Sequence, residues 1–260
     1  MKVACICPTY GRPHLVPSTI WLFQAQKNTG FDLRLFILDD ANQFDSQVHT
    51  NWELLVRRDR FPSLGAKINA LVRQAVDWGA EIICMWDDDD IYLSEHVQNH
   101  VLEILETNTQ WSVPRTKYFL SGGTELKKAY HDVPYCHGSW AYRTEAWRAI
   151  RGYSEEGITD FDYDFARRLR EHFGSPCDPT KDREAQFVYR WYSPGHQNFS
   201  GLYGTTTNPY TAMSGQGDHI PRHGIPINPT LDAEARKVVS VIEAGSLSDS
   251  EVILIYLSST

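Results

Sequence analysis

Strand-like and helix-like segments alternate over roughly the first hundred residues, and this alternation limits the folds open to the chain. Short apolar runs typical of buried strands lie at residues 2–7, 33–38 and 81–86. Between the last two, apolar residues recur at helical spacing from Leu64 to Val76, with Ser63 as the candidate N-cap and Gly79 just beyond. Residues 14–27 form a similar but less regular segment. The pattern predicts an α/β fold with a mostly parallel central sheet and helices on both faces.

The second half of the chain is less regular. Short strands are expected at residues 111–113 and 117–120. Helices are expected after Ser94, from a Thr144 N-cap to Ile150, from Asp162 or Tyr163 to just before Gly174, and over residues 231–244. Residues 192–229 are rich in Gly, Pro, Ser, Thr, Asn and His without a period, which predicts a long loop of the kind that often forms a functional lid. Residues 252–257 form a last apolar run.

Composition and charge exclude several classes of protein. A 260-residue chain with 42% apolar and 22% charged residues can bury a sizeable core and has the balance of an ordinary soluble domain. No apolar run is long enough to span a bilayer, and the chain enters its first strand without a basic leader, which favours a cytoplasmic protein with no membrane span. The five cysteines lack zinc-site spacing and are expected to be reduced. A net charge of −8 argues against a nucleic-acid partner.

Polar residues follow each of the three expected strands in the first half. The three clusters are Pro8, Thr9 and Tyr10 after the first strand, Asp39 and Asp40 after the second, and the four aspartates 87–90 after the third. In open parallel sheets, ligands bind at the carboxyl ends of the strands. We therefore expect all three clusters to meet at one edge of the sheet.

Four consecutive aspartates after a buried strand are destabilising unless a positive charge lies nearby. Two like charges ~4 Å apart repel by roughly 1 kcal/mol in water and by more at a partly buried site. If the backbone stays extended, Asp87 and Asp89 point to one side, and Asp88 and Asp90 point to the other. Two carboxylates on one side suit Mg²⁺ or Mn²⁺, which prefer oxygen ligands. The alternative is a solvated acidic turn before the next helix, since Asp is favoured near helix N-termini.

Four short segments follow one another in the first half, and they read PTYGRP, ILDD, SLGAKIN and MWDDDDIY. Their order resembles the nucleotide-binding half of family 2 glycosyltransferases, which have the GT-A fold. The segments SWAYRTEAWRAIRGY and DFDYDFARRL continue the resemblance, because they are similar to the acceptor-side segment of that family and to the start of its catalytic helix. The resemblance covers about residues 3–170.

The resemblance implies a single Rossmann-like GT-A domain over residues 1–230, followed by a C-terminal helix and tail over 231–260. Residues 1–110 would bind the nucleotide sugar, and residues 111–230 would form the acceptor and catalytic half, with a small antiparallel region and the 192–229 loop. The implied partners are a nucleotide-diphospho-sugar donor, with UDP as the expected nucleotide, and a hydroxyl acceptor. The sequence leaves the donor sugar open, and glycan, lipid-linked, protein and modified-nucleotide acceptors all remain candidates.

The resemblance also implies roles for individual residues. Donor contacts fall on Pro8, Thr9, Tyr10, Arg12, Asp39, Lys67, Asn69, Asp87 and Asp88. Among these, Asp39 matches the acid that hydrogen-bonds the base, and Asp87 would lie nearer the ribose. Asp89 matches the metal ligand of the family's Asp-x-Asp motif. Asp162 matches the catalytic base, with Asp160 as the second candidate.

Three positions depart from the family pattern. Ile68 stands where an arginine is common, which removes a candidate diphosphate contact. Arg151 precedes Gly152 in place of a second glycine. Phe161 replaces the acidic residue that usually precedes the base. For Asp162 itself the alternative is a cap at the start of the following helix, since Asp is among the best N-cap residues.

The chemistry of the implied reaction requires a metal ion, Mn²⁺ or Mg²⁺, and a base. Cleavage of the sugar–phosphate bond leaves a nucleoside diphosphate, and a metal that bridges its phosphates stabilises the negative charge. The attacking hydroxyl must lose a proton, which Asp162 or Asp160 would accept, and in-line attack would invert the anomeric centre. In related transferases a late His or Asp often completes the metal site, and by this resemblance His196 is the candidate here, with His219 and His223 as rivals.

Aromatic side chains could stack on a sugar ring or belong to the core, and both roles stay open for Trp140, Trp191 and Tyr192. The main hypothesis is a metal-dependent, inverting glycosyltransferase. One alternative is a metal-dependent nucleotidyltransferase or phosphohydrolase, but the sequence has no Walker-type phosphate loop. The other is a non-catalytic carbohydrate-binding module that retains the fold. The candidate base speaks against such a module, because binding alone requires no proton acceptor.

Overall fold

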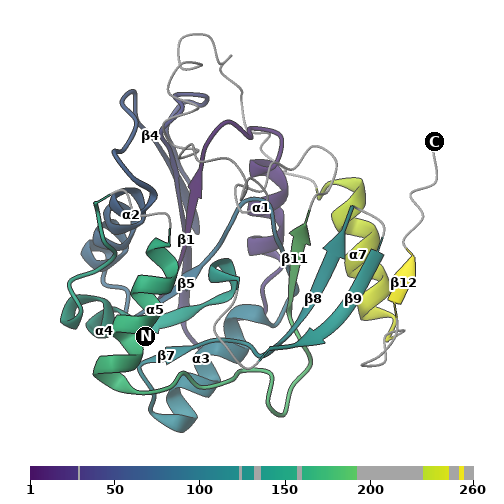
Figure 1. Ribbon diagram of the computed structural model, residues 1–260. Coiled ribbons are helices and arrows are strands. Elements are labelled where there is room, and N and C mark those ends of the chain that lie inside the picture. Colours follow the sequence, from purple (N-terminus) through teal and green to yellow (C-terminus); the bar gives the residue numbers. More distant parts are fainter. Residues whose placement is uncertain are drawn as a thin grey trace.

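The computed structural model describes residues 1–28, 30–122, 125–131, 136–156, 160–191, 231–245 and 252–254 (Figure 1). The segment expected to form a long loop, 192–229, lies outside these described residues. In the part of the chain that is described, no helix combines the length and the apolar character needed to cross a membrane.

A seven-stranded sheet forms the centre of the molecule, with the strand order β3-β4-β2-β1-β5-β10-β7. Its strands are β1 (Lys2–Thr9), β2 (Asp32–Asp39), β3 (Gln47–Val48), β4 (Trp52–Val56), β5 (Ile82–Met85), β7 (Trp111–Ser112) and β10 (Ala141–Arg143). Strands β4, β2, β1 and β5 run parallel, whereas β3 and β10 are antiparallel to their neighbours. The predicted α/β fold with a mostly parallel sheet is confirmed. Strand β4 was not expected, because its short pattern WELLV interrupts the apolar run with Glu53.

Helices cover both faces of this sheet, as predicted. They are α1 (Val16–Gln24), α2 (Leu64–Trp78), α3 (His96–Thr107), α4 (Thr144–Ala149) and α5 (Phe161–Phe173). A further helix, α7 (Ala233–Glu243), lies beside the second sheet described below, and a short 3₁₀ turn, η1, spans His137–Ser139. Side chains alternate along β1, so Val3, Cys5 and Cys7 share a core cluster with residues of α1 and α3. Ala4 and Ile6 point the other way and share a cluster with residues of α2 and α5.

The start and end of α2 follow the predicted signals. The Ser63 side chain accepts a hydrogen bond from the Ala66 amide, and Gly79 ends the helix in the left-handed conformation. Two other predicted caps are wrong by one residue. Glu95 rather than Ser94 precedes α3. Thr144 is the first residue of α4 rather than its cap, because its amide donates to the Glu81 carbonyl at 3.0 Å and thereby fastens the helix start to β5.

A second sheet has the strand order β12-β9-β8-β11-β6. Its strands are β6 (Ile91–Tyr92), β8 (Thr116–Ser121), β9 (Glu125–Tyr130), β11 (Phe187–Trp191) and β12 (Val252–Leu254). All neighbouring pairs are antiparallel except β8 and β11, which run parallel. Helix α7 lies beside this sheet (Figure 1), and its Ala235 and Val238 are buried in the same core cluster as α1 and α3. Among these strands, β6, β9 and β11 were not expected.

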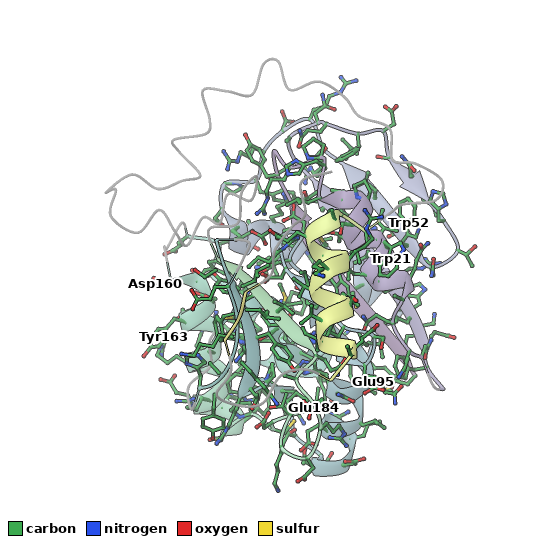
Figure 2. All side chains as sticks on the ribbon, turned by 90° about the vertical axis from the view of Figure 1, so that its right-hand side faces the viewer. Trp21, Trp52, Glu95, Asp160, Tyr163 and Glu184 are labelled. Atoms are coloured by element: carbon green, nitrogen blue, oxygen red, sulfur yellow. The ribbon has the colours of Figure 1, made fainter. Side chains whose placement is uncertain are left out.

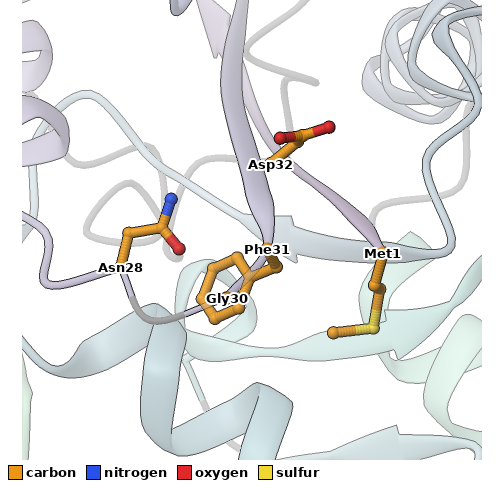
Figure 3. Close-up of a pocket in the computed structure, with 5 residues that line it drawn as sticks. All are labelled: Met1, Asn28, Gly30, Phe31 and Asp32. Carbon is orange, nitrogen blue, oxygen red and sulfur yellow. The ribbon is translucent and has the colours of Figure 1, made fainter.

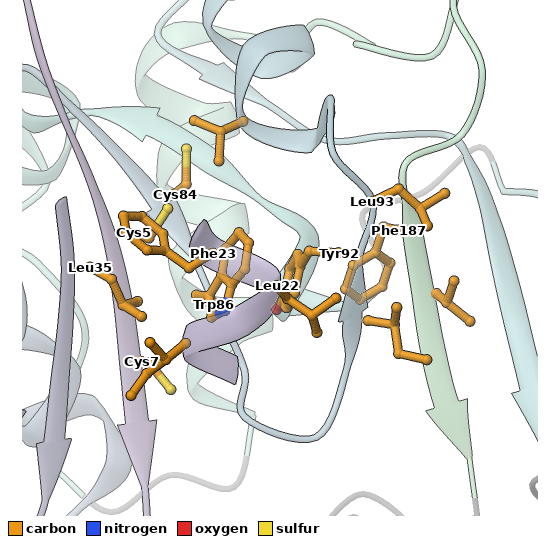
Figure 4. Close-up of a cluster of buried hydrophobic side chains, with 14 of the residues drawn as sticks. Cys5, Cys7, Leu22, Phe23, Leu35, Cys84, Trp86, Tyr92, Leu93 and Phe187 are labelled. Carbon is orange, nitrogen blue, oxygen red and sulfur yellow. The ribbon is translucent and has the colours of Figure 1, made fainter. Parts of the chain in front are cut away.

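A stack of aromatic rings fixes the backbone between β5 and β6. The Trp86 and Tyr92 rings stack with their centroids 3.8 Å apart, and Phe23 of α1 meets the edge of Trp86 (Figure 4). Both Trp86 and Tyr92 are fully buried. Because these rings bracket the four aspartates in the sequence, their packing determines where the acidic turn leaves the core.

The structure explains why glycine stands at position 65 of the SLGAKIN segment. It is the second residue of α2, and a β-carbon at this position would clash with the backbone carbonyl oxygen of Ser154. Alanine usually stabilises a helix relative to glycine by about 1 kcal/mol. Here the close approach of α2 to the segment after α4 reverses that preference.

We expect Gly65→Ala to lower the free energy of unfolding by about 2 kcal/mol or more, because the obstacle is a backbone atom that cannot rotate away. The matched control is Gly122→Ala, where φ is +59° and no atom lies within 4 Å, so that only backbone strain of about 1 kcal/mol applies. Chemical denaturation of both variants measures the difference. Equal losses would contradict the proposed clash.

Candidate active site

The parallel register brings the predicted polar clusters to one edge of the central sheet. Thr9 at the end of β1 pairs with Asp39 at the end of β2, and Ile6 pairs with Met85 at the end of β5. Pro8, half-buried, stands opposite Leu38 in the same register. The expected convergence of the strand ends is confirmed.

The four aspartates follow a turn, and their side chains do not alternate as an extended strand would require. The backbone turns at Asp88 and Asp89 before β6 begins. As a result, carboxylate oxygens of Asp87, Asp89 and Asp90 lie within 4.8 Å of one another. The expectation that Asp90 would point away with Asp88 is therefore wrong, and Asp90 joins the cluster that sequence reasoning assigned to two residues.

Arg12 provides positive charge next to this acidic turn. Its guanidinium contacts the Asp88 carboxylate at 2.6 Å and the Asp89 carboxylate at 2.5 Å. The Thr9 hydroxyl donates a further hydrogen bond to Asp88 at 2.6 Å. Burial lowers the pKa of Arg12, but Asp88 and Asp89 outweigh it and raise the pKa above the usual range. The predicted residues Thr9, Arg12, Asp88 and Asp89 thus form one connected network.

Asp87 occupies the most crowded position in the cluster. Its amide donates a hydrogen bond to the Tyr92 hydroxyl at 2.6 Å, and its carboxylate packs against Gly138, where a β-carbon would clash with it. Burial of the carboxyl group, followed by the charges of Asp89 and Asp88, raises the pKa of Asp87 to about 8. A carboxyl group held in this way gains most from a nearby cation.

The donor set and the crowding fit a divalent metal ion. Three carboxylates can each offer an oxygen to a common point, and hard cations such as Mg²⁺ and Mn²⁺ prefer such ligands. Burial first, and then repulsion from the neighbouring aspartates, raise the pKa of Asp87 and of Asp90, and a bound cation would offset both effects.

Lys67 fastens the ends of β1 and β2 together from inside α2. Its ammonium donates to the Thr9 carbonyl at 2.6 Å and forms an ion pair with Asp40, and both side chains are fully buried. Burial lowers the pKa of Lys67, although Asp40 opposes the shift. Asp39 accepts hydrogen bonds from the Ala41 and Gln43 amides at 2.8 and 2.6 Å. Lys67 and Asp39 therefore hold the edge to which the family resemblance assigns the nucleotide.

Asn69 holds a different part of the site together. Its side chain donates to the Tyr153 carbonyl and to Glu155 at 2.9 Å each, and it accepts from the Tyr153 amide and the Trp147 indole at 2.9 and 3.0 Å. These bonds clamp α2 to the turn at Gly152, whose φ is +73°. In this structure Asn69 supports the segment that follows α4, and its predicted donor contact stays a prediction.

Tyr10 lies at the rim of the site, where the Arg60 guanidinium stands 4.0 Å from its ring centroid. Tyr10 is 8% exposed. Arg60 lies in the segment after β4, and because β4 was not expected, the sequence did not predict this contact. A cation above an aromatic face stabilises both groups by about 0.5–1 kcal/mol. The pair lies at the end of β1, where Tyr10 stands two residues before Arg12 in the sequence.

The two base candidates lie at the start of α5. Asp160 is the N-cap residue, and Asp162 accepts a hydrogen bond from the Tyr163 amide at 2.8 Å. Figure 2 shows Asp160 and Tyr163 on the same side of the molecule, with Tyr163 exposed. Burial raises the pKa of Asp162, and the charge of Asp162 is one of those that raise the pKa of Asp87. Asp162 therefore lies within electrostatic range of the aspartate cluster.

The remaining candidates divide between the core and the undescribed segment. Trp140 is 2% exposed and meets the edge of Trp111, so it belongs to the core rather than to a sugar-binding surface. Trp191 ends β11. Tyr192, His196, His219 and His223 lie outside the described residues.

Two functional-site neighbours were missed by sequence reasoning. Arg190 of β11 is fully buried against the aspartate turn. His137 lies beside Gly138, with a ring nitrogen 2.9 Å from the Tyr153 hydroxyl and its ring edge against Phe161. The only available signal for Arg190 was a charged residue inside an apolar run, FVYRW, and a single histidine such as His137 carries no signal of its own.

A cavity of about 290 Å³ opens at the opposite edge of the sheet, lined by Met1, Asn28, Gly30, Phe31 and Asp32 (Figure 3). Met1 precedes β1, Asp32 begins β2, and the other three residues precede β2, so the cavity lies at the opposite ends of these strands from Thr9 and Asp39. It is not part of the candidate active site.

The mostly parallel sheet, with an acidic cluster at the carboxyl ends of its strands, is similar to the GT-A fold of glycosyltransferases. The model of glycosyl transferase family 2 matches residues 4–173, which is more than half of the 260-residue chain. The chain belongs to this family. A comparison with curated proteins finds no match by sequence.

Solved structures share the fold at low sequence identity. TarS 1–349 of S. aureus has a TM-score of 0.56 at 15% identity, over 73% of this chain and 60% of that chain. The same protein in complex with UDP-GlcNAc has a TM-score of 0.59 at 14% identity, over 80% of this chain and 62% of that one. The mannosyltransferase PcManGT from Pyrobaculum calidifontis, in complex with GDP-Man and Mn²⁺, has a TM-score of 0.51 at 14% identity, over 72% and 56%. This chain therefore spans about three fifths of the length of these structures.

His137 generates a pH prediction. Burial lowers its pKa to about 3, whereas an unfolded chain has a histidine pKa of about 6.5. The unfolded state binds the extra proton below about pH 6.5, so the stability contributed by neutral His137 is complete above that pH and declines as the pH falls. Relative to His137→Gln, the wild-type protein should lose about 2 kcal/mol of unfolding free energy between about pH 7.5 and pH 5.

Denaturant titrations at the two pH values measure this difference. His172→Gln, at an exposed position of α5, controls for the loss of an imidazole as such. Parallel pH profiles of the wild-type and His137→Gln proteins would contradict the prediction.

Proposed function

We propose that this protein is a metal-dependent, inverting glycosyltransferase that moves a sugar from a UDP-sugar to a hydroxyl acceptor in the cytoplasm. The observation that carries the proposal is the convergence of the Asp87, Asp89 and Asp90 carboxylates at the carboxyl edge of the sheet. Asp162 lies within electrostatic range of the same cluster. Metal ligands and a proton acceptor at one end of the sheet suit sugar transfer from a nucleoside-diphosphate sugar, because the leaving diphosphate gains negative charge and the attacking hydroxyl loses a proton.

Asp89 and Asp87, with Asp90 beside them, would hold Mn²⁺ or Mg²⁺. When bound, the ion would supply electrostatic stabilisation of the charge that develops on the diphosphate leaving group. The PcManGT structure contains Mn²⁺ together with GDP-Man, which supports the choice of metal. His196 remains our candidate for an additional ligand.

The donor would lie along the ends of β1, β2 and β5. Asp39 would accept a hydrogen bond from the base, and Tyr10 would border the base at the rim where Arg60 stands. Arg12, held between Asp88 and Asp89, would meet the negative charge of the diphosphate. Lys67 contributes by fixing the strand ends from below, because its ammonium is fully engaged inside the protein.

Asp162 would accept the proton of the attacking hydroxyl. Its pKa is raised by burial, and a base works best when its pKa approaches the working pH. Its place at the start of α5, beside exposed Tyr163, leaves it next to solvent where an acceptor can approach. Asp160 is the alternative base, one residue before the helix.

The metal prediction concerns Asp89. We expect UDP with Mn²⁺ to raise the melting temperature of the wild-type protein, because a ligand that binds the folded state stabilises it. Asp89→Asn should abolish this shift by removing a ligand charge. Asp77→Asn, an exposed acid near the end of α2, is the control and should keep the shift. A wild-type protein that no nucleoside diphosphate stabilises, with or without metal, would overturn the proposed function.

The base prediction concerns Asp162. We expect Asp162→Asn to leave UDP binding nearly intact and to reduce transfer by roughly 10²–10⁴-fold, because only the proton-accepting oxygen is lost. Glu171→Gln on the exposed face of α5 is the matched control and should transfer sugar at the wild-type rate.

The measurement is release of nucleoside diphosphate from a panel of sugar donors, with and without Mn²⁺. Full activity of Asp162→Asn would move the base to Asp160 or elsewhere. Binding of UDP without transfer or donor hydrolysis, across many sugars and acceptors, would instead favour a non-catalytic binding module.

A further inference from the structure

Arg190 is a fully buried charged residue. It lies in β11, and its side chain is 0% exposed. Burial of an arginine is costly unless carboxylates or carbonyl groups meet its donors. The groups that Arg190 meets come from two distant parts of the chain, the aspartate turn and the start of α7.

The first set of contacts is with the aspartate turn. Phe187 pairs with Tyr92 and Val188 with Ile91, so the antiparallel register of β11 and β6 continues to place Arg190 opposite Asp89. The Arg190 amide donates to the Asp90 carboxylate at 3.0 Å. The Arg190 guanidinium Nε donates to the Asp89 backbone carbonyl. Arg190 therefore holds the backbone of one metal-ligand candidate and the side chain of the next.

The second set of contacts is with helix α7, the yellow helix that faces the viewer in Figure 2. Arg190 Nη1 lies 3.4 Å from a carboxylate oxygen of Asp232, the N-cap of α7, and 3.4 Å from one of Glu234 in its first turn. Asp232 also caps the helix by accepting from the Ala235 amide at 2.7 Å. The same guanidinium thus joins the start of α7 to the aspartate turn.

We propose that Arg190 is a positioning residue for the metal site. Arg190 holds the Asp89–Asp90 turn in the conformation that binds the metal only while Asp232 and Glu234, at the start of α7, hold its guanidinium. This inference rests on the proposed function and adds to it a supporting contact from outside the site. The C-terminal helix, far from the nucleotide half in sequence, becomes part of the support for metal binding. Arg190 itself contacts neither the nucleotide nor the ion in this scheme.

The physical basis is the geometry of an arginine fork. Its planar guanidinium fixes the directions of several donors at once, so a carbonyl on one side and carboxylates on the other are held at defined positions. Residues that hydrogen-bond to metal ligands, without contacting the metal, orient those ligands. Their removal typically weakens metal binding by about 10–100-fold. A lysine in the same place keeps the positive charge and loses the fork.

The experiment compares Mn²⁺ binding, measured by electron paramagnetic resonance in the presence of UDP, for three full-length variants. Asp232→Asn with Glu234→Gln removes both α7 carboxylates while asparagine retains the cap. Arg190→Lys retains the positive charge at position 190 and removes the planar guanidinium. Glu243→Gln, exposed at the far end of α7, is the matched control. UDP affinity without metal and the melting temperature are measured in parallel.

We expect Mn²⁺ affinity to fall about tenfold in the double variant and in Arg190→Lys, with the control unchanged. Variants that melt earlier but bind Mn²⁺ as tightly as the wild-type protein would overturn the inference, because Arg190 would then serve stability alone. Wild-type Mn²⁺ affinity in Arg190→Lys would also overturn it, since charge rather than the fork would be responsible. Failure of the wild-type protein to bind Mn²⁺ and UDP would instead overturn the proposed function, and this inference with it.

Discussion

The structure depends on the burial of four consecutive carboxylates beside two arginines. Asp88 and Asp90 are almost fully buried, and neither position would be tolerable as an isolated charge. Arg12 approaches the turn from the end of β1, and Arg190 approaches it from β11 on the other side. The mutual repulsion of the aspartates is thereby confined to the Asp87, Asp89 and Asp90 oxygens, which is where a bound cation would relieve it.

The rest of the fold delivers these groups to one place. Parallel pairing of β1, β2 and β5 aligns their carboxyl ends, and Lys67 in α2 ties two of those ends together. The Trp86–Tyr92 stack fixes both ends of the acidic turn in the core. Asn69 fixes another part of the site, because its hydrogen bonds to Tyr153 hold α2 against the segment before α5. Buried polar contacts of this kind specify one arrangement of the elements, whereas apolar contacts alone would allow several.

Much of this was predictable from local patterns. The apolar runs of β1, β2 and β5 and the helical spacing of α2, with its Ser63 cap and Gly79 terminus, predict the alternation that a parallel sheet requires. Motifs at the strand ends then predict where the polar residues meet. The caps Ser94 and Thr144 were displaced by one residue, because tertiary hydrogen bonds to neighbouring elements determine which residue begins each helix.

The sequence by itself determined the parallel strands β1, β2 and β5, the end of the sheet at which the polar residues meet, and the acidic character of that end, because each of these follows from the period and order of neighbouring residues. Only the tertiary structure decided that β4 and β10 extend the sheet, that Asp90 joins Asp87 and Asp89, that Asn69 supports the segment after α4, and that Arg190 links the acidic turn to α7. Those outcomes depend on a backbone turn and on contacts between residues up to a hundred positions apart. No local pattern predicts which distant charged residue will contact a buried carboxylate, because the packing of the elements determines that pairing.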